Sequence, residues 1–126
     1  MPALFSKEQR KEFSMKRIEA IICPDKVSVV CAALAEIGPH GVTVSAVEGR
    51  DTGQGWMHHL RGASFHDTVR ARSRVEVVVK DEDAMRAIGA IRDSAAAGGA
   101  GDGTIFVHDL AEVIRIRTSE SGVAAL

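Results

Sequence analysis

Apolar and polar residues alternate strictly in several short segments of the chain, and this period predicts strands that are buried on one face. Residues on one face are Ile18, Ala20 and Ile22 in "KRIEAIIC", Val42, Val44 and Ala46 in "VTVSAVEG", and Val75, Val77 and Val79 in "RVEVVVK". Nearer the C-terminus, "TIFVHDL" and "EVIRIRT" are predicted as two further short strands. The alternation therefore predicts a sheet made from segments along the whole chain.

Two longer segments have helical spacing instead. The first, "PDKVSVVCAALAEIG", starts with Pro24, which suits a first helical turn, and ends at Gly38. The second, "DEDAMRAIGAIRDSAAAGG", has acidic residues in its first turn, where they favour helix formation. The side chains expected to face the core are Val27, Val30, Cys31, Leu34 and Ile37 in the first helix and Met85, Ile88 and Ile91 in the second.

The order of these elements predicts the fold class. Two strand–helix–strand halves on one antiparallel sheet form a ferredoxin-like βαββαβ sandwich of the α+β class, with a short extra strand at the C-terminus. Regularity is interrupted between Arg50 and about Ser73, and a loop of this length in a compact domain is usually functional or disordered. The helices would cover one sheet face. Val47, Val78 and Phe106 would leave the other face apolar, which predicts a homo-oligomer.

Composition restricts the binding partners and the cellular location that we expect for the protein. The chain has 126 residues and a formal net charge of −1, so neither nucleic-acid binding nor attraction to an anionic membrane is expected. Cys23 and Cys31 lie in apolar patterned segments without metal-binding spacing, and we interpret them as buried thiols in a reducing compartment. Residues 1–14 form an N-terminal extension without a signal-peptide core, so a cytoplasmic location is expected, without membrane insertion.

The segment "GAGDGTIFVHDLAEVIRIRT" suggests an anion site. In a strand, Arg115 and Arg117 would share one face, with Ile114 and Ile116 turned toward the core. Two guanidinium groups can bind adjacent phosphates by forked hydrogen bonds, and the glycines before the strand expose backbone N–H groups to a phosphate. A solvated polar edge and a flexible connection are the structural alternatives. Taken together, the glycines and arginines favour a phosphate site.

Other chemistry is less well supported. His58, His59 and His66 lie in the long loop, where a metal site is conceivable, but no carboxylate or thiol motif accompanies them. No nucleophile with a neighbouring base is evident, so the protein is not expected to be an enzyme. A metal-binding trimer and a weak nucleotide phosphohydrolase are kept as alternatives.

Several of these segments together resemble the PII signal-transduction family. The resemblance rests on "MKRIEAIICP", "ALAEIGPHGVTV", "LRGASF", "GDGTIFVHDLAEVIRIRT" and the tail "AAL", and it covers residues 15–126 almost without gaps. It implies a ferredoxin-like subunit in a homotrimer with adenine nucleotides in the clefts between subunits. It also implies a protruding T-loop at about residues 50–73, which docks on a regulated partner.

The resemblance assigns roles to individual positions. Gly101, Asp102 and Gly103 match the family's phosphate-binding loop, and Arg115 and Arg117 match arginines contributed by the neighbouring subunit. Further matched positions line the base, the ribose and the base of the T-loop; they are Gly41, Val42, Thr43, Glu76, Val78, Ile21, Gly49 and Arg50.

The chain also departs from the family pattern. Family members that sense 2-oxoglutarate carry a glutamine where this chain has Gly53, and an arginine is usual at Thr52. A lysine that commonly reaches the terminal phosphate is replaced by Thr104, which predicts that ADP or AMP is favoured over ATP. The tyrosine that is uridylylated in some members aligns with Phe65, which has no hydroxyl group for that reaction.

These departures resemble PII-like groups that respond to inorganic carbon, including carboxysome-associated ones. Bicarbonate is therefore expected as a second effector, bound by Arg50, Arg61, His58 or His59 in the cationic loop. The regulated partner would be a membrane transporter or a metabolic enzyme, and Trp56 would report the change in loop shape. The alternative is a conventional nitrogen-regulatory PII protein that senses ATP and 2-oxoglutarate.

Overall fold

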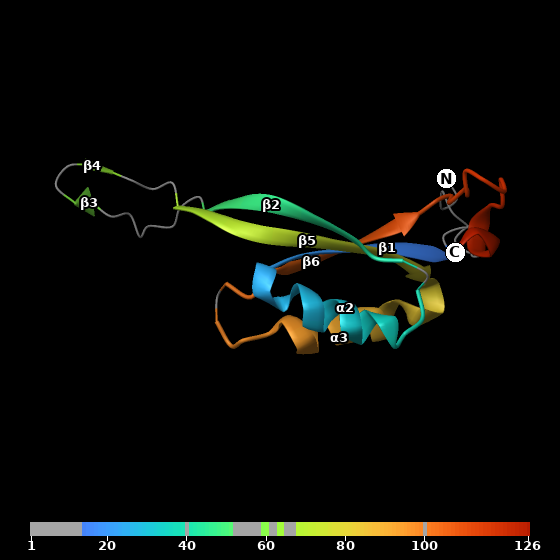
Figure 1. Cartoon of the computed structure of the whole chain (residues 1–126), viewed down its shortest axis with the longest axis horizontal. Helices are drawn as coiled ribbons and strands as arrows, with labels where there is room; N and C mark the ends of the chain where they lie inside the picture. Colours follow the sequence, from blue (N-terminus) through green and yellow to red (C-terminus); the bar gives the residue numbers. More distant parts are fainter. Residues whose placement is uncertain (1–13, 40, 52–58, 61–62, 65–67, 100) are drawn as a thin grey trace, which may run out of the picture.

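The fold is a four-stranded antiparallel sheet covered on one face by two helices, in a computed structural model (Figure 1). The structure describes residues 14–39, 41–51, 59–60, 63–64, 68–99 and 101–126. The strand order is β2-β5-β1-β6, so β1 pairs with β5 on one side and β6 on the other. This confirms the predicted ferredoxin-like α+β class.

The strands and helices alternate along the chain as the residue pattern predicts. Short 3₁₀ turns over Pro24–Lys26 and Asp81–Asp83 lead into the helices, and Gly122–Ala125 forms another. A separate two-stranded pair, β3 and β4, lies in the loop that follows β2. The strands are β1 (Met15–Ile22), β2 (Thr43–Asp51), β3 (His59–Leu60), β4 (Ala63–Ser64), β5 (Thr68–Lys80) and β6 (Thr104–Leu110), and the helices are α2 (Val27–Ala35) and α3 (Ala84–Ala95).

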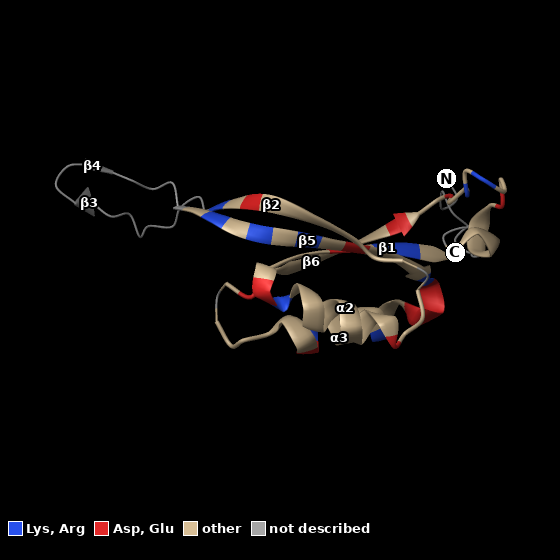
Figure 2. Ribbon diagram, in the orientation of Figure 1, with Lys and Arg blue, Asp and Glu red and all other residues tan. Residues whose placement is uncertain are grey.

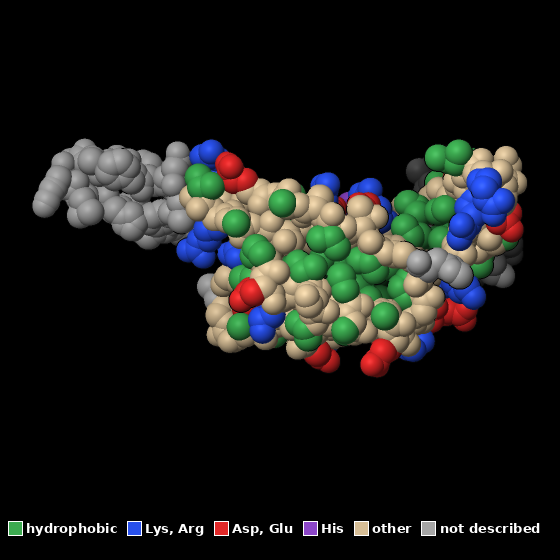
Figure 3. Space-filling view, in the orientation of Figure 1, with side chains coloured by type: hydrophobic (Ala, Val, Ile, Leu, Met, Phe, Trp, Pro, Cys, Tyr) green, Lys and Arg blue, Asp and Glu red, His purple; other side chains and the backbone are tan. Residues whose placement is uncertain are grey.

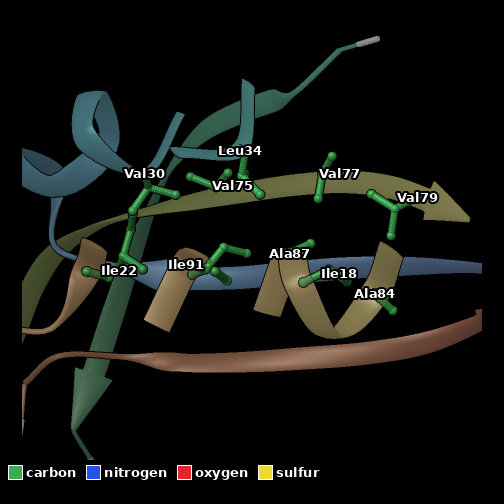
Figure 4. Packing of buried hydrophobic residues seen from close by; sticks show 12 residues of the cluster. Ile18, Ile22, Val30, Leu34, Val75, Val77, Val79, Ala84, Ala87 and Ile91 are labelled. Atoms are coloured by element: carbon green, nitrogen blue, oxygen red, sulfur yellow. The ribbon is translucent and has the colours of Figure 1, made fainter. Parts of the chain in front are cut away.

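The core lies between the sheet and the helices (Figure 4). The faces predicted for β1 and β5 are confirmed, because Ile18, Ala20, Ile22, Val75, Val77 and Val79 are all buried. Val30 and Leu34 of α2 are fully buried against them. Both cysteines are only partly buried, contrary to the prediction.

The inward face of α3 differs from the predicted one. Met85 was expected to face the core but is 76% exposed, while Ala84, Ala87, Ile91 and Ala95 are buried. Ala84 at the start of α3 faces the core in place of Met85, and the other buried residues follow it at helical spacing. α3 also contacts α2, and small alanine side chains allow that close approach.

The second face of the sheet carries ion pairs among its apolar side chains. Arg17 lies 3.3 Å from Glu76, and Arg74 lies 3.6 Å from Glu19, measured between side-chain nitrogen and oxygen. Phe106 on the same face is 46% exposed. This face is therefore mixed in character, rather than apolar as predicted.

The long irregular segment is shorter at both ends than predicted. β2 continues to Asp51 and β5 begins at Thr68, so the two strands extend past the helices as a ribbon (Figure 1). Beyond the helices neither face of the ribbon is buried by them, so the sequence lacks an apolar period there. Backbone pairing alone defines these strand ends. No helix in the described ranges is long and apolar enough to cross a membrane.

Substitution of the core should separate buried from exposed apolar positions. Leu34→Ala is expected to lower the free energy of unfolding by about 2–5 kcal/mol, because it removes a fully buried side chain. Met85→Ala should change it by less than about 0.5 kcal/mol, because that side chain is exposed. Chemical denaturation of both variants measures the difference. A large effect of Met85→Ala would contradict the assigned face of α3.

Candidate functional site

The glycine loop before β6 lies against the end of β1. Gly103 has φ +112°, and a Cβ atom at this position would overlap the carbonyl oxygen of Ile21. Only glycine combines this backbone conformation with such a close approach. The loop therefore depends on Gly103 for its position.

Asp102 shapes this loop from within. Its two carboxylate oxygens accept hydrogen bonds from the backbone N–H groups of Ala97 and Gly98, each at 3.1 Å. The bond from Ala97, with that from Gly98, lowers the pKa of Asp102 below its ordinary value. The carboxylate is thus occupied by the loop's own backbone.

Arginines of β5 lie beside the same loop. A Cβ atom on Gly101 would lie 3.3 Å from Nη2 of Arg72 and 3.6 Å from Nη1 of Arg70. Nη1 of Arg72 donates a hydrogen bond of 3.0 Å to Sγ of Cys23, which in turn donates to the Gly101 carbonyl oxygen at 3.5 Å. Figure 2 shows basic residues along β5 toward the tip of the ribbon that it forms with β2.

The sequence reasoning missed these two arginines. The i, i+2 spacing that drew attention to "RIR" also occurs in "RARSR", where Arg70, Arg72 and Arg74 fall on one face of β5. Applying the same rule to that segment would have found them. Gly49 pairs with Arg70, and a Cβ atom there would lie 3.1 Å from Cγ of Arg72. Gly49 therefore leaves room for the Arg72 side chain.

A second group of predicted residues lines a cavity of about 620 Å³ near the other end of the sheet. Its size lies in the range typical of small-molecule sites. Thr43 and Glu76 are directly paired across β2 and β5. In the space-filling view, apolar side chains gather between β2 and α2 and again on the C-terminal segment (Figure 3). The predicted residues in the lining are Gly41, Thr43, Glu76, Val78 and Arg115.

The C-terminal segment is a compact arm, and the prediction of a strand for "EVIRIRT" is wrong. Ile114 makes one isolated bridge with Ser121, and the backbone N–H of Arg115 donates to Glu120 within the arm. Ile114 and Ile116 are 62% and 99% exposed, so the prediction that they face the core is also wrong. β6 ends at Leu110, which pairs with the first residue of β1, so the chain beyond it has no β1 residue left to pair with.

The predicted alignment of the two arginines consequently does not hold. Nε of Arg115 donates a hydrogen bond of 2.9 Å to the carbonyl oxygen of Ala125, and this side chain borders the cavity. Arg117 is exposed in the turn that follows, and its side chain does not share a strand face with Arg115.

The glycine loop and the arm lie at opposite ends of β6 (Figure 1). The seven residues of β6 span about 20 Å at roughly 3.3 Å per residue. Within one chain, the Arg115 side chain and the Gly101–Gly103 loop are therefore too far apart to bind the same phosphate. The predicted site residues therefore lie in two separate groups, which we call the loop half-site, around Gly101, and the cavity half-site, around Glu76. Arg70 and Arg72, which were not predicted, lie beside the loop half-site.

The remaining predicted residues are distributed as follows. Val42 packs against the core, and Thr104 begins β6 opposite Ile21. Arg50 pairs with Val69 in the ribbon, and its guanidinium lies 2.9 Å from Glu48.

The predictions for the long loop concern residues that are mostly not described. His59 lies in β3. The predictions that concern Thr52, Gly53, Trp56, His58, Arg61, Phe65 and His66 fall outside the described residues. Across the parts of the chain that are described, no three His, Cys, Asp or Glu side chains form a group that could hold a metal.

Comparison with known proteins identifies relatives along nearly the whole chain. The family model for nitrogen regulatory protein P-II matches residues 15–120. A nitrogen regulatory protein P-II from Rhizobium meliloti is 46% identical over 112 residues, covering 89% of this chain and 100% of the relative. P-II 2 from Methanothermobacter thermautotrophicus is 42% identical, covering 89% of this chain and 97% of the relative.

Solved structures of PII proteins are also similar to this chain. Arabidopsis thaliana PII bound to citrate has a TM-score of 0.73 and 36% identity, covering 90% of this chain and 92% of that one. The B. subtilis GlnK-ATP complex has a TM-score of 0.77 and 26% identity, covering 90% and 97%.

The glycine loop can be tested by adding a single methyl group. Gly103→Ala is expected to destabilise the protein by more than about 1 kcal/mol, because alanine is disfavoured at positive φ and would overlap Ile21. Gly99→Ala is the matched control, since a Cβ atom there meets nothing within 4 Å. Thermal unfolding compares the two. Equal melting temperatures would contradict the close approach of the loop to β1.

The pKa of Asp102 gives a second test of the loop. Because backbone hydrogen bonds lower the pKa in the folded protein, the carboxyl group should titrate below about 3.9, the value for an unfolded chain. Its stabilisation is then present above that pH and is lost as pH falls through the lower folded pKa. NMR of the carboxyl carbon measures the midpoint. A midpoint above 3.9 would be inconsistent with these bonds.

Proposed function

Because the chain belongs to the nitrogen regulatory protein P-II family, we propose that it is a signal-transduction regulator that binds an adenine nucleotide between copies of itself. Nucleotide binding alters the T-loop at about residues 50–73, and the altered loop binds or releases a regulated protein. The partner is a membrane transporter or a metabolic enzyme. The proposed setting is the cytoplasm, and the proposed role includes no catalytic step.

The separation of the two half-sites is the observation that carries this proposal. The loop half-site offers backbone N–H groups and guanidinium groups, which suit phosphates. The cavity half-site is roomy and partly apolar, which suits a base and ribose. Since one chain cannot bring both to one ligand, a second copy completes the site. The B. subtilis GlnK-ATP complex, similar over 90% of this chain, supports ATP-type ligands.

The two contributing surfaces differ, so the contact between copies is head-to-tail, and such contacts form a ring when the rotation between copies closes. We propose a homotrimer, in line with the family resemblance. The exposed isoleucines of the arm, Ile114 and Ile116, support burial against another copy. Arg115 of the arm then approaches the nucleotide bound at the neighbour's glycine loop.

The choice of nucleotide depends on two features with opposite effects. Thr104 replaces a phosphate-reaching lysine, which favours ADP or AMP over ATP. Arg70 and Arg72 add positive charge beside Gly101, which favours more phosphates. Bicarbonate is the proposed second effector, with 2-oxoglutarate as the alternative of a conventional nitrogen sensor. Among the residues proposed for bicarbonate, Arg50 is ion-paired with Glu48.

Calorimetric titration tests the proposed function. ATP, ADP and AMP are titrated alone, with 2-oxoglutarate and with bicarbonate, and at least one nucleotide should bind. Arg115→Ala should weaken that binding roughly 10- to 100-fold, the effect of losing a charged hydrogen bond. Arg86→Gln is the control, because the Arg86 side chain is exposed on α3 and pairs with Asp83, three residues earlier in the chain. Unchanged affinity in folded, trimeric Arg115→Ala would exclude the assigned site. Metal analysis of the purified protein distinguishes the nucleotide regulator from the metal-binding alternative, because only the latter should contain a bound metal.

A further inference from the structure

We propose that Arg70 and Arg72 bind the terminal phosphate of a nucleoside triphosphate, in place of the lysine that Thr104 replaces. This inference rests on the proposed function, because it concerns the phosphate end of the same nucleotide. It assigns a specificity-determining role to two residues of β5 and makes ATP a full ligand of this protein.

The first support is the convergence of both guanidinium groups on one point of the glycine loop. Nη2 of Arg72 and Nη1 of Arg70 both approach the open side of Gly101, at 3.3 and 3.6 Å from the position of a Cβ atom. Because Gly101 has no side chain, both guanidinium groups can approach its backbone closely, and their other N–H groups lie beside the glycine loop. One phosphate there can accept hydrogen bonds from both side chains.

Charge is the second support. Among the described residues, no carboxylate is ion-paired with Arg70 or Arg72, whereas Arg74 on the same face pairs with Glu19. The nearby carboxylate of Asp102 is occupied by backbone N–H groups of its own loop. Two adjacent cations that no carboxylate of the described residues neutralises favour an anion between them. A terminal phosphate carries the highest charge density on a nucleotide.

The third support is that Arg72 is held in place. Its stem lies over Gly49, where a Cβ atom would be 3.1 Å from Cγ, and its Nη1 donates to Cys23 Sγ at 3.0 Å. Cys23 is linked in turn to the Gly101 carbonyl oxygen. The guanidinium therefore faces the loop before any ligand arrives, which reduces the entropy lost on binding.

The direction in which the phosphate chain runs along the loop determines which phosphate lies at the arginines. Gly103 lies against Ile21 within the sheet, while Gly101 lies farther out, beside the ribbon of β2 and β5. With the base in the cavity half-site of the neighbouring copy, we take the phosphates to pass from Gly103 to Gly101 and to end at the two arginines. AMP is too short to reach this point, so the arginines discriminate by phosphate number.

The experiment measures ATP and AMP affinity in Arg70→Gln, Arg72→Gln and the double variant. Titrations are done with Mg²⁺ removed by a chelator, so that only protein cations hold the terminal phosphate. Each single variant should weaken ATP roughly tenfold, as expected for loss of a charged hydrogen bond, and leave AMP within about twofold. Arg86→Gln, in the first turn of α3, should change neither.

A rescue variant tests the same role independently of folding defects. Thr104→Lys in the double-variant background should restore ATP affinity at least about fivefold without improving AMP, because it returns a cation to the phosphate end. Alkylation of Cys23, followed by mass spectrometry, gives another readout. ATP should protect this thiol more than AMP does, since Arg72 and its bound phosphate then cover it.

The outcomes separate the two proposals. If the unaltered protein binds no adenine nucleotide, the proposed function fails, and this inference fails with it. If it binds nucleotides but the arginine variants lose ATP and AMP equally, or lose neither, the proposed function stands and the terminal-phosphate role is overturned. A selective loss of ATP, rescued by Thr104→Lys, establishes the role.

Discussion

The pairing of β1 with both of its neighbours is the constraint on which the rest of the structure depends. β1 is the strand that joins β5 to β6, and its register with β6 sets Ile21 opposite Thr104 and Met15 opposite Leu110. This register brings Gly103 against the Ile21 carbonyl at one end and sends the C-terminal arm off the other end. A slip of one residue would turn the buried face of β1 toward solvent, so the core fixes the register and, through it, both half-sites.

The antiparallel direction of β6 has a functional consequence. Segments that are close in sequence, the glycine loop and the arginine-bearing arm, are separated by the full length of a strand. A chain built this way cannot complete the proposed site alone, but several copies arranged head-to-tail complete it repeatedly. Exposure of Ile114 and Ile116, unfavourable in an isolated subunit, is accounted for in the proposed trimer.

The positive charge beside the glycine loop comes from residues that the fold brings near it, rather than from residues close to it in the sequence. Thr104 lacks the cation expected there, yet Arg70 and Arg72, more than thirty residues earlier, lie beside Gly101. A phosphate responds to the potential at its own location, whichever strand supplies it. Residue-by-residue comparison therefore registers only the missing cation at Thr104, whereas the fold brings two arginines of β5 beside the loop.

The sequence by itself determined the strands with strict alternation, both helices, the fold class and the family, because period-2 and period-3.6 burial leave local signatures. Tertiary structure decided what those periods do not encode. The inward face of α3 depends on its contact with α2, and the extent of β2 and β5 depends on backbone pairing beyond the helices. The arm is not a strand because no residue of β1 remains to pair with it. Which cations surround the glycine loop was likewise decided by strand pairing, since proximity across a sheet joins residues that sequence separates.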